Sequence, residues 1–99
     1  YVYVLALPSG LSTYVFDPDL NSPQPLCNQV CAEKWPPVLL TPEDVASLQA
    51  PYGSLTRASG LNQLTLNGRP VYTFFADRVE GDIKGDGLGG VWHANRVNP

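Results

Sequence analysis

The hydrophobic pattern at the start of the chain predicts a β-hairpin. Residues 1–7 (YVYVLAL) are aromatic or aliphatic throughout, which is typical of a strand that is buried on both faces. Residues 8–10 (PSG) have the composition of a turn, and residues 11–16 (LSTYVF) return to strand composition. We therefore expect residues 1–16 to form two antiparallel strands joined by a tight connection.

Prolines and a capping residue organise the middle of the chain. Residues 17–25 (DPDLNSPQP) predict a loop, and residues 27–35 predict a short helical turn that ends at the prolines that follow. Thr41 is suited to cap a helix, Pro42 suits its first position, and two acids follow at its positive end. The sequence therefore predicts one short helix over about residues 42–49.

The strongest turn signal lies in the second half of the chain. The Asn67-Gly68 pair separates strands expected at residues 61–66 and 69–75. Asn-Gly favours a two-residue hairpin turn because both central positions of such a turn must accept a positive φ. This pattern predicts a second hairpin. The remaining expected elements are a glycine-rich loop and a final short strand, at residues 81–90 and 91–94.

An internal repeat relates the two predicted hairpins. The pattern Gly-x-x-x-Tyr-x-Phe-x-x-Asp occurs twice, 58 residues apart, and a tryptophan follows each copy. Neither unit can bury its aromatic face alone, so the two units are expected to pack together over about residues 1–40 and 61–94. The matching residues are Gly10, Tyr14, Phe16, Asp19 and Trp35 in the first unit, and Gly68, Tyr72, Phe74, Asp77 and Trp92 in the second.

Length and charge restrict the kinds of partner. The chain has 99 residues and a mass of 10.7 kDa, which suits one small domain, and we expect it to cover residues 1–99. Acids exceed bases and give a net charge of −3, which argues against binding to nucleic acid. No apolar run reaches the roughly 18–20 residues that span a bilayer, so no transmembrane segment is expected.

The two cysteines indicate a compartment. The C-x-x-x-C spacing of Cys27 and Cys31 matches neither a thioredoxin-like redox motif nor half of a zinc site. A structural disulfide is the favoured interpretation, and it indicates the periplasm, the cell surface or the medium. The alternative is a cytosolic protein with two free buried thiols. With the disulfide, the predicted fold class is mainly β: a small disulfide-stapled domain of two pseudo-repeated β-hairpin units with one short helix.

Several motifs, in order along the chain, resemble a known family. YVFDPD (residues 14–19) and YTFFAD (residues 72–77) resemble the Y-x-[FWY]-x-x-D signature of a bacterial secreted-repeat and lipoprotein family. The likeness continues in CNQVCAEKWPP (residues 27–37), in NGRPVY (residues 67–72) and in GVWH (residues 90–93). That family is extracytoplasmic and often lipid-anchored, and its biochemical function is unassigned. The resemblance therefore implies a location and leaves the activity open.

The repeated aromatic and acidic residues have a structural interpretation. A Tyr and a Phe two positions apart share one face of a strand, and an Asp just past the strand can accept the amide protons of a turn. The alternative is that paired tyrosines and acids form a binding groove, a redox site or a metal site. The residues concerned are Tyr14, Phe16, Asp19, Trp35, Tyr72, Phe74, Asp77 and Trp92.

Asp82, Asp86 and His93 are the candidate metal ligands. The two aspartates hold the first and fifth positions of a segment like a calcium loop, but Lys84 stands where an oxygen ligand is needed. His93 replaces the terminal glutamate, so a standard EF-hand is excluded. The favoured interpretation is a solvated turn with a surface histidine and no cofactor. The alternative is a metal-binding or redox-accessory protein that holds a single metal ion through His93 and the acidic loop at residues 77–86.

The sequence lacks the arrangements that are typical of catalysis. A serine or cysteine nucleophile would need His93, the one histidine, as its base, and no nucleophile motif surrounds any serine. We therefore expect a non-enzymatic extracytoplasmic interaction module, such as an accessory subunit of a larger surface or membrane-associated assembly. An unknown protein partner is expected at residues 1–7, because an extended apolar segment can pair with the edge of a partner's sheet.

Overall fold

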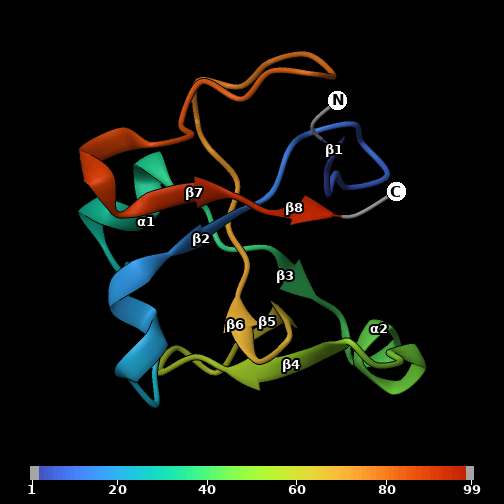
Figure 1. Cartoon of the computed structure of the whole chain (residues 1–99). Coiled ribbons are helices and arrows are strands. Elements are labelled where there is room, and N and C mark those ends of the chain that lie inside the picture. The colour runs from blue at the N-terminus through green and yellow to red at the C-terminus, as the bar shows by residue number, and fades with distance from the viewer. Residues whose placement is uncertain (1–2, 98–99) are drawn as a thin grey trace.

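The computed structural model describes residues 3–97, so the start of the first expected strand, at residues 1–2, lies outside the described residues (Figure 1). Short strands predominate, which confirms the mainly β class. In chain order the elements are β1 (Tyr3–Val4), β2 (Tyr14–Phe16), the 3₁₀ helix η1 (Asp17–Asn21), α1 (Val30–Lys34), β3 (Leu39–Leu40), α2 (Pro42–Ser47), β4 (Tyr52–Thr56), β5 (Asn62–Leu66), β6 (Arg69–Pro70), the 3₁₀ helix η2 (Leu88–Gly90), β7 (Trp92–Ala94) and β8 (Arg96–Val97).

Helix α2 begins as its capping residues predict. The Thr41 hydroxyl accepts a hydrogen bond from the Asp44 N–H at 3.1 Å, and the Asp44 carboxylate accepts one from the Thr41 N–H at 3.0 Å. This reciprocal pair satisfies two backbone donors at the start of the helix. The helix ends at Ser47 because Leu48 is extended, two residues before the expected end. A second short helix, α1, forms where only a helical turn was expected.

The first hairpin forms, but its first strand is less buried than the sequence predicts. Gly10 has a φ of 93° in the turn, and the Leu7 N–H donates to the Leu11 carbonyl at 2.9 Å. Val4 is half-buried and Ala6 is exposed, so the prediction of a strand buried on both faces is wrong. The physical reason is that this segment lies at the margin of the fold, where packing covers only part of it.

The second hairpin turns at Asn67-Gly68, and both residues have the positive φ that such a turn requires, 53° and 81°. Strand β6 pairs antiparallel with β5, but it is much shorter than the strand expected at residues 69–75. The shortening has a structural cause. Just beyond β6 the Val71 N–H still donates to the Leu64 carbonyl of β5 at 3.0 Å, and Tyr72 then pairs with Tyr14.

Strand β4 was not predicted from the sequence. It lies antiparallel to β5 over five residue pairs, from Tyr52 opposite Leu66 to Thr56 opposite Asn62. Its sequence, YGSLT, holds few apolar residues, so its hydrophobic signal is weak. Strand β3 pairs with the opposite edge of β5, so the strand order is β3-β5-β4. Strand β6 pairs with β5 along the same edge as β3.

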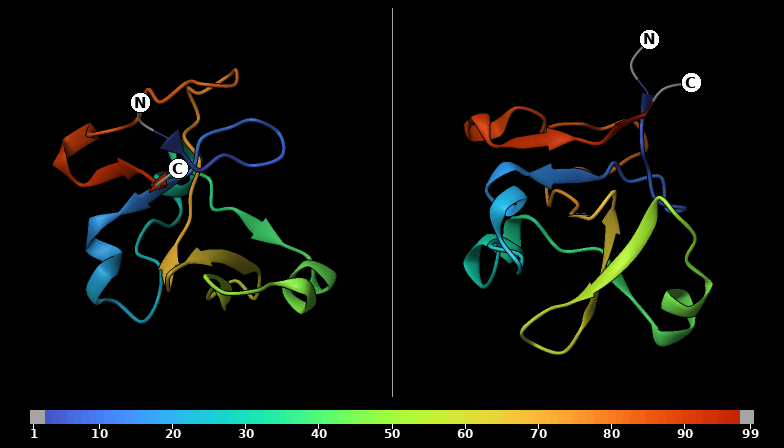
Figure 2. Two further views of the ribbon diagram at one scale, coloured as in Figure 1. Left: turned by 45° about the vertical axis from the view of Figure 1, so that its right-hand side comes forward. Right: turned by 60° about the horizontal axis from the view of Figure 1, so that its bottom comes forward.

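The two ends of the described chain come together in space. Strand β1 pairs with β8, and β2 pairs with β7. Figures 1 and 2 show β1 and β8 at one end of the molecule, with β4 and α2 at the opposite end. Residues far apart in sequence therefore build the central part of the fold.

One antiparallel strand pair in the first hairpin has a counterpart in the second half of the chain. In one pair, β1 lies against β8 with Tyr3 opposite Val97; in the other, β5 lies against β3 with Asn62 opposite Leu40. The repeat motifs meet where Tyr14 and Tyr72 exchange backbone hydrogen bonds of 2.8 and 2.9 Å. The limits expected for the units, about 1–40 and 61–94, stay a prediction. The matched segments are called the first copy and the second copy below, and they comprise residues 3–40 and 62–97.

Candidate functional site

The tyrosine of each copy bonds to the aspartate of the other copy. The Tyr14 hydroxyl donates to Asp77 Oδ2 at 2.6 Å, and the Tyr72 hydroxyl donates to Asp19 Oδ2 at 2.7 Å. All four side chains are buried. The two bonds cross between the copies and tie each copy to the other.

These polar groups are fully engaged by the fold. Burial, and after it the hydrogen bond to the carboxylate, raises the pKa of both Tyr14 and Tyr72 well above the ordinary value, so both hydroxyls stay protonated and able to donate. The other oxygen of each aspartate accepts a backbone N–H from the residue seven positions further along the chain, at 2.8 and 3.0 Å. Each carboxylate therefore joins the tyrosine of the other copy to a turn in its own copy.

A stack of four aromatic rings lies beside the crossed bonds. Trp35 and Trp92 are parallel within 2°, with their ring centroids 3.7 Å apart. Phe16 stacks on Trp92 at 4.2 Å, and Phe74 lies against Trp35 at 4.3 Å. Each phenylalanine thus contacts the tryptophan of the other copy. The structure places the repeated aromatic residues in core contacts between the copies.

The cysteines form the predicted disulfide in the first copy, between Cys27 and Cys31. A closed loop this short stabilises the fold by about 2 kcal/mol on the chain-entropy model. In the second copy the position of Cys27 is taken by Gly85. A Cβ atom there would lie only 2.5 Å from the ring of Trp35, so this copy has no room for a side chain.

Asp82, the first candidate metal ligand, organises a turn. Its Oδ2 accepts the backbone N–H groups of Arg78 at 2.9 Å and Val79 at 3.2 Å. These two donors lower the pKa of the Asp82 carboxyl. The same residue lies 3.8 Å from the Lys84 ammonium. Asp82 therefore stabilises its own loop.

Asp86 and His93 are engaged in separate places. Asp86 accepts the Ala94 N–H at 2.9 Å and pairs with the Arg96 guanidinium, whereas His93 Nε2 lies 2.9 Å from Asp17 Oδ2. Within residues 3–97, no group of three histidine, cysteine or acidic side chains lies close enough together to hold a metal ion. The structure does not bring the three candidate ligands together.

The two copies differ in what covers their first strand. In the second copy, β5 has β3 and β6 along one edge and β4 along the other. In the first copy, β8 and the returning strand, with Ser12 opposite Ala6, lie along one edge of residues 3–7. No described strand lies along the other edge of residues 3–7. That edge is called the free edge below.

Backbone hydrogen bonds at Leu5 define which groups face the free edge. The Leu5 N–H donates to the Asn95 carbonyl at 2.7 Å, and the Leu5 carbonyl accepts from the Thr13 N–H at 3.0 Å. Backbone groups of successive residues in an antiparallel strand point to opposite sides. The N–H and carbonyl groups of Val4 and Ala6 therefore point to the free edge.

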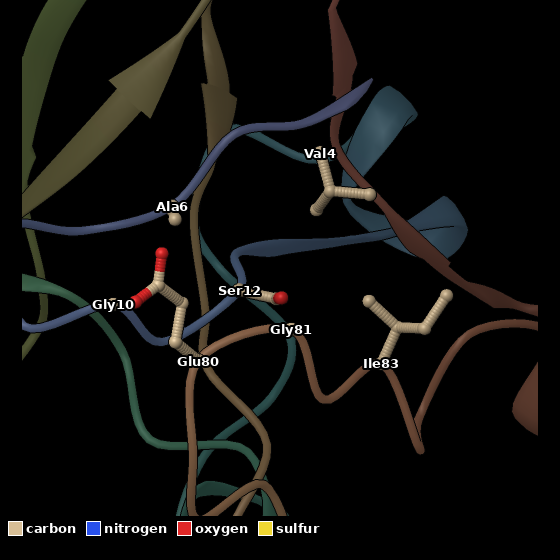
Figure 3. A pocket seen from close by; sticks show the side chains of 7 residues that line it. All are labelled: Val4, Ala6, Gly10, Ser12, Glu80, Gly81 and Ile83. Carbon is tan, nitrogen blue, oxygen red and sulfur yellow. The ribbon is translucent and has the colours of Figure 1, made fainter. Parts of the chain in front are cut away.

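A pocket of about 280 Å³ lies over one face of the first hairpin, between residues 4–6 and the loop at residues 80–83 (Figure 3). In the figure, Ile83 lies near Val4 at one end of the pocket, and the carboxylate of Glu80 points toward Ala6 at the other. One end is therefore apolar and the other acidic. The lining residues are Val4, Ala6, Gly10, Ser12, Glu80, Gly81 and Ile83.

The corresponding face of the second copy is filled by its own side chains. Leu64 bonds to Val38 and Val71 as Leu5 bonds to Asn95 and Thr13, because the second turn is one residue shorter than the first. Gln63, one residue before Leu64, therefore occupies the position of Val4, and it is fully buried. The Arg57 guanidinium, just past β4, donates to Gln63 Oε1 at 2.6 Å and to the Cys27 carbonyl at 3.0 Å. In the second copy, β4 and Arg57 together cover the strand edge that corresponds to the free edge of the first copy.

The sequence led us to expect a partner surface on the first strand, but it did not predict the pocket. Glu80 and Ile83 come from the loop before η2, for which the sequence favoured an acidic, solvated turn, with a metal loop as the alternative. The signal that could have found them is the internal repeat, because Glu80 and Ile83 occupy positions at which the first copy has Ser22 and Pro25.

Residues 53–95 match a family described as a secreted repeat of unknown function. The match spans most of β4 and nearly all of the second copy, and it confirms the resemblance inferred from the motifs over this part of the chain. The comparisons with curated proteins and with solved structures gave no match. Within residues 3–97, no helix is long and apolar enough to cross a membrane.

Proposed function

Starting from the match to a secreted repeat family, we propose that this chain is a non-enzymatic extracytoplasmic interaction module, located in the periplasm, at the cell surface or in the medium. It docks an extended strand of a protein partner on the free edge of residues 3–7, as an accessory subunit of a larger assembly. One observation carries the proposal: β5 is paired along both edges, whereas the equivalent segment is paired along one.

Docking at a sheet edge has a direct physical basis. An open edge presents unpaired N–H and carbonyl groups, and a second chain can pair with them. Val4 and Ala6 each offer one donor and one acceptor to such a strand. Each bond that forms contributes about 0.5–1.5 kcal/mol, and the pocket adds side-chain contacts. The free edge therefore offers both backbone and side-chain recognition.

The engagement of the polar core supports a role without catalysis. Asp19 and Asp77 each accept one tyrosine hydroxyl and one backbone N–H, which leaves them shielded and occupied. The separate engagement of Asp86 and His93 gives no specific support to the alternative of a metal-binding or redox-accessory protein. Interaction through the free edge is thus the function that the geometry supports best.

The proposal is tested by the native mass of the protein isolated gently from its natural source. We expect the wild-type protein to run well above its own 10.7 kDa, together with a partner. Ala6→Pro removes the N–H that points to the free edge, so we expect it to run alone. Ala6→Gly keeps this N–H and is the matched control, because it changes the same residue and should keep the partner.

Two results would contradict the proposal. One is a wild-type protein that runs at its monomer mass. The other is an Ala6→Pro variant that keeps the partner as firmly as Ala6→Gly. Circular dichroism and thermal unfolding of both variants show whether each is folded, so loss of the partner can be separated from loss of structure.

A further inference from the structure

The pocket over the face of the first hairpin has two chemically different ends. Val4 and Ile83 supply aliphatic surface at one end, and Glu80 supplies a carboxylate at the other (Figure 3). Glu80 takes part in none of the ion pairs found among residues 3–97. The acidic end is therefore electrostatically complementary to a basic side chain.

The second copy shows how a strand on this edge is oriented. Strand β4 runs antiparallel to β5, with Gly53 opposite Thr65 and Leu55 opposite Gln63. Thr65 and Gln63 occupy the positions of Ala6 and Val4. A docked strand of the same orientation places two residues, two positions apart, on the face of the pocket. The earlier one lies opposite Ala6 and the later one opposite Val4.

A strand docked on the free edge can carry a larger side chain opposite Ala6 than the glycine that β4 has at the matching position. A Cβ atom at Gly53 would lie 3.1 Å from the Thr65 hydroxyl, so this position of β4 is tight. Ala6 has no hydroxyl and is exposed, so a long side chain can stand opposite it. Such a side chain can extend across the small Ala6 toward the Glu80 carboxylate, which points at Ala6 from the side of the returning strand.

We propose that the partner strand carries the sequence basic-x-aliphatic: a Lys or Arg opposite Ala6 that pairs with Glu80, and an aliphatic residue opposite Val4 that packs on Val4 and Ile83. This specificity rests on the proposed function, because it requires a strand on the free edge. Backbone pairing supplies the affinity for any extended segment, and the pocket selects among segments.

A synthetic peptide of residues 51–58 that carries Gly53→Lys is a suitable probe, since β4 already forms a strand of this orientation and has Leu55 at the aliphatic position. Its binding to the protein is measured by titration calorimetry at low ionic strength. We expect the same peptide with Gly53→Glu to bind at least about five-fold more weakly. A peptide with Gly53→Lys and Leu55→Ser should also bind more weakly, because it loses the aliphatic contact.

Charge reversal in the protein sharpens the test. In Glu80→Lys we expect the preference between the two peptides to reverse, with the Gly53→Glu peptide now the tighter. Glu80 is exposed, so this variant should fold. Glu33→Lys is the matched control, because it makes the same charge change at an exposed residue that does not line the pocket, and it should keep the preference for lysine.

Failure of this inference can be separated from failure of the proposed function. A peptide N-methylated at Leu55 lacks a donor for the free edge and should lose most of its binding. If no peptide binds, or N-methylation has no effect, docking at the free edge is contradicted. If N-methylation abolishes binding but the Lys and Glu peptides bind equally to both the wild-type protein and Glu80→Lys, docking stands and the basic-x-aliphatic preference is overturned.

Discussion

The two copies share a core but differ at their margins. Each copy donates a tyrosine hydroxyl to the aspartate of the other copy and places a phenylalanine on the tryptophan of the other copy. In the second copy β4 pairs along the outer edge of the first strand, whereas in the first copy that edge is free and a pocket lies over the adjoining face. Packing of the core therefore does not explain why one edge is covered and the other is open.

The comparison separates structural from functional residues. Residues that match between the copies, such as Tyr14 and Tyr72, make matching contacts and serve the fold. Residues that do not match, such as Val4 against Gln63, lie where the copies differ in their surroundings. Function is therefore expected at the mismatched positions, because the side chains at the matched positions are engaged in the core.

The largest effect is expected in the shared core. Trp35→Ala and Trp92→Ala each remove a buried ring from the stack, and each should lower the free energy of unfolding by about 3–5 kcal/mol. The two values should be similar because the rings have similar surroundings. Denaturant titration of both variants measures them. A loss below about 1 kcal/mol for one of them would show that the copies do not share a core.

The next effect tests a position at which the copies differ. Gly85→Ala places a Cβ atom 2.5 Å from the ring of Trp35, and overpacking of this kind costs about 1–3 kcal/mol. Gly53→Ala is the control, because its nearest contact, the Thr65 hydroxyl at 3.1 Å, belongs to a short rotatable side chain. Thermal unfolding should rank Gly85→Ala below Gly53→Ala. The reverse ranking would contradict the packing described for the second copy.

The crossed bonds predict a pair of matched effects. Tyr14→Phe leaves the buried Asp77 without its hydroxyl donor, and Tyr72→Phe does the same to Asp19. Each change should cost about 1–3 kcal/mol of stability, the usual penalty for an unpaired buried polar group. Urea unfolding at neutral pH measures both. If one variant is as stable as the wild-type protein, that bond does not hold the copies together.

The smallest effect is expected for proline at Ala6, and it is compared with proline at the matched position Thr65. Thr65→Pro removes an N–H that points toward β4, so we expect a loss of about 1–3 kcal/mol. Ala6→Pro removes the corresponding N–H at the free edge and should cost less than about 0.5 kcal/mol. Chemical unfolding of the pair gives the difference directly. Equal losses would mean that the edge at Ala6 is already paired.

Local signals in the sequence were sufficient for several elements. Asn67-Gly68 predicts its turn because both residues tolerate a positive φ, and Thr41 predicts the start of α2 because its hydroxyl caps the first turn. The constant offset between the two tyrosine motifs predicts that they pack together. These features depend on residues close in sequence or on a spacing that can be read directly.

Pairing between strands that are far apart in the sequence could not be predicted from such local signals. Strand β4 has too little hydrophobic alternation to be recognised, and it forms because β5 offers it a partner. The shortness of β6 also reflects tertiary contact, since Tyr72 pairs with Tyr14. The pocket joins a loop residue, Glu80, to a strand at the other end of the sequence. The internal repeat marks Glu80 as a mismatched position, but spacing along the sequence does not show that the two segments meet.

Amide hydrogen exchange tests the difference between the copies most directly. The account predicts that the amides of Val4 and Ala6 exchange within about ten-fold of the unprotected rate, while those of Leu5, Gln63 and Thr65 are strongly protected. Leu5 is the internal control, because its N–H is bonded to the Asn95 carbonyl. Protection of Val4 and Ala6 as strong as that of Gln63 and Thr65, in the protein alone, would show that the edge is closed and would contradict docking there.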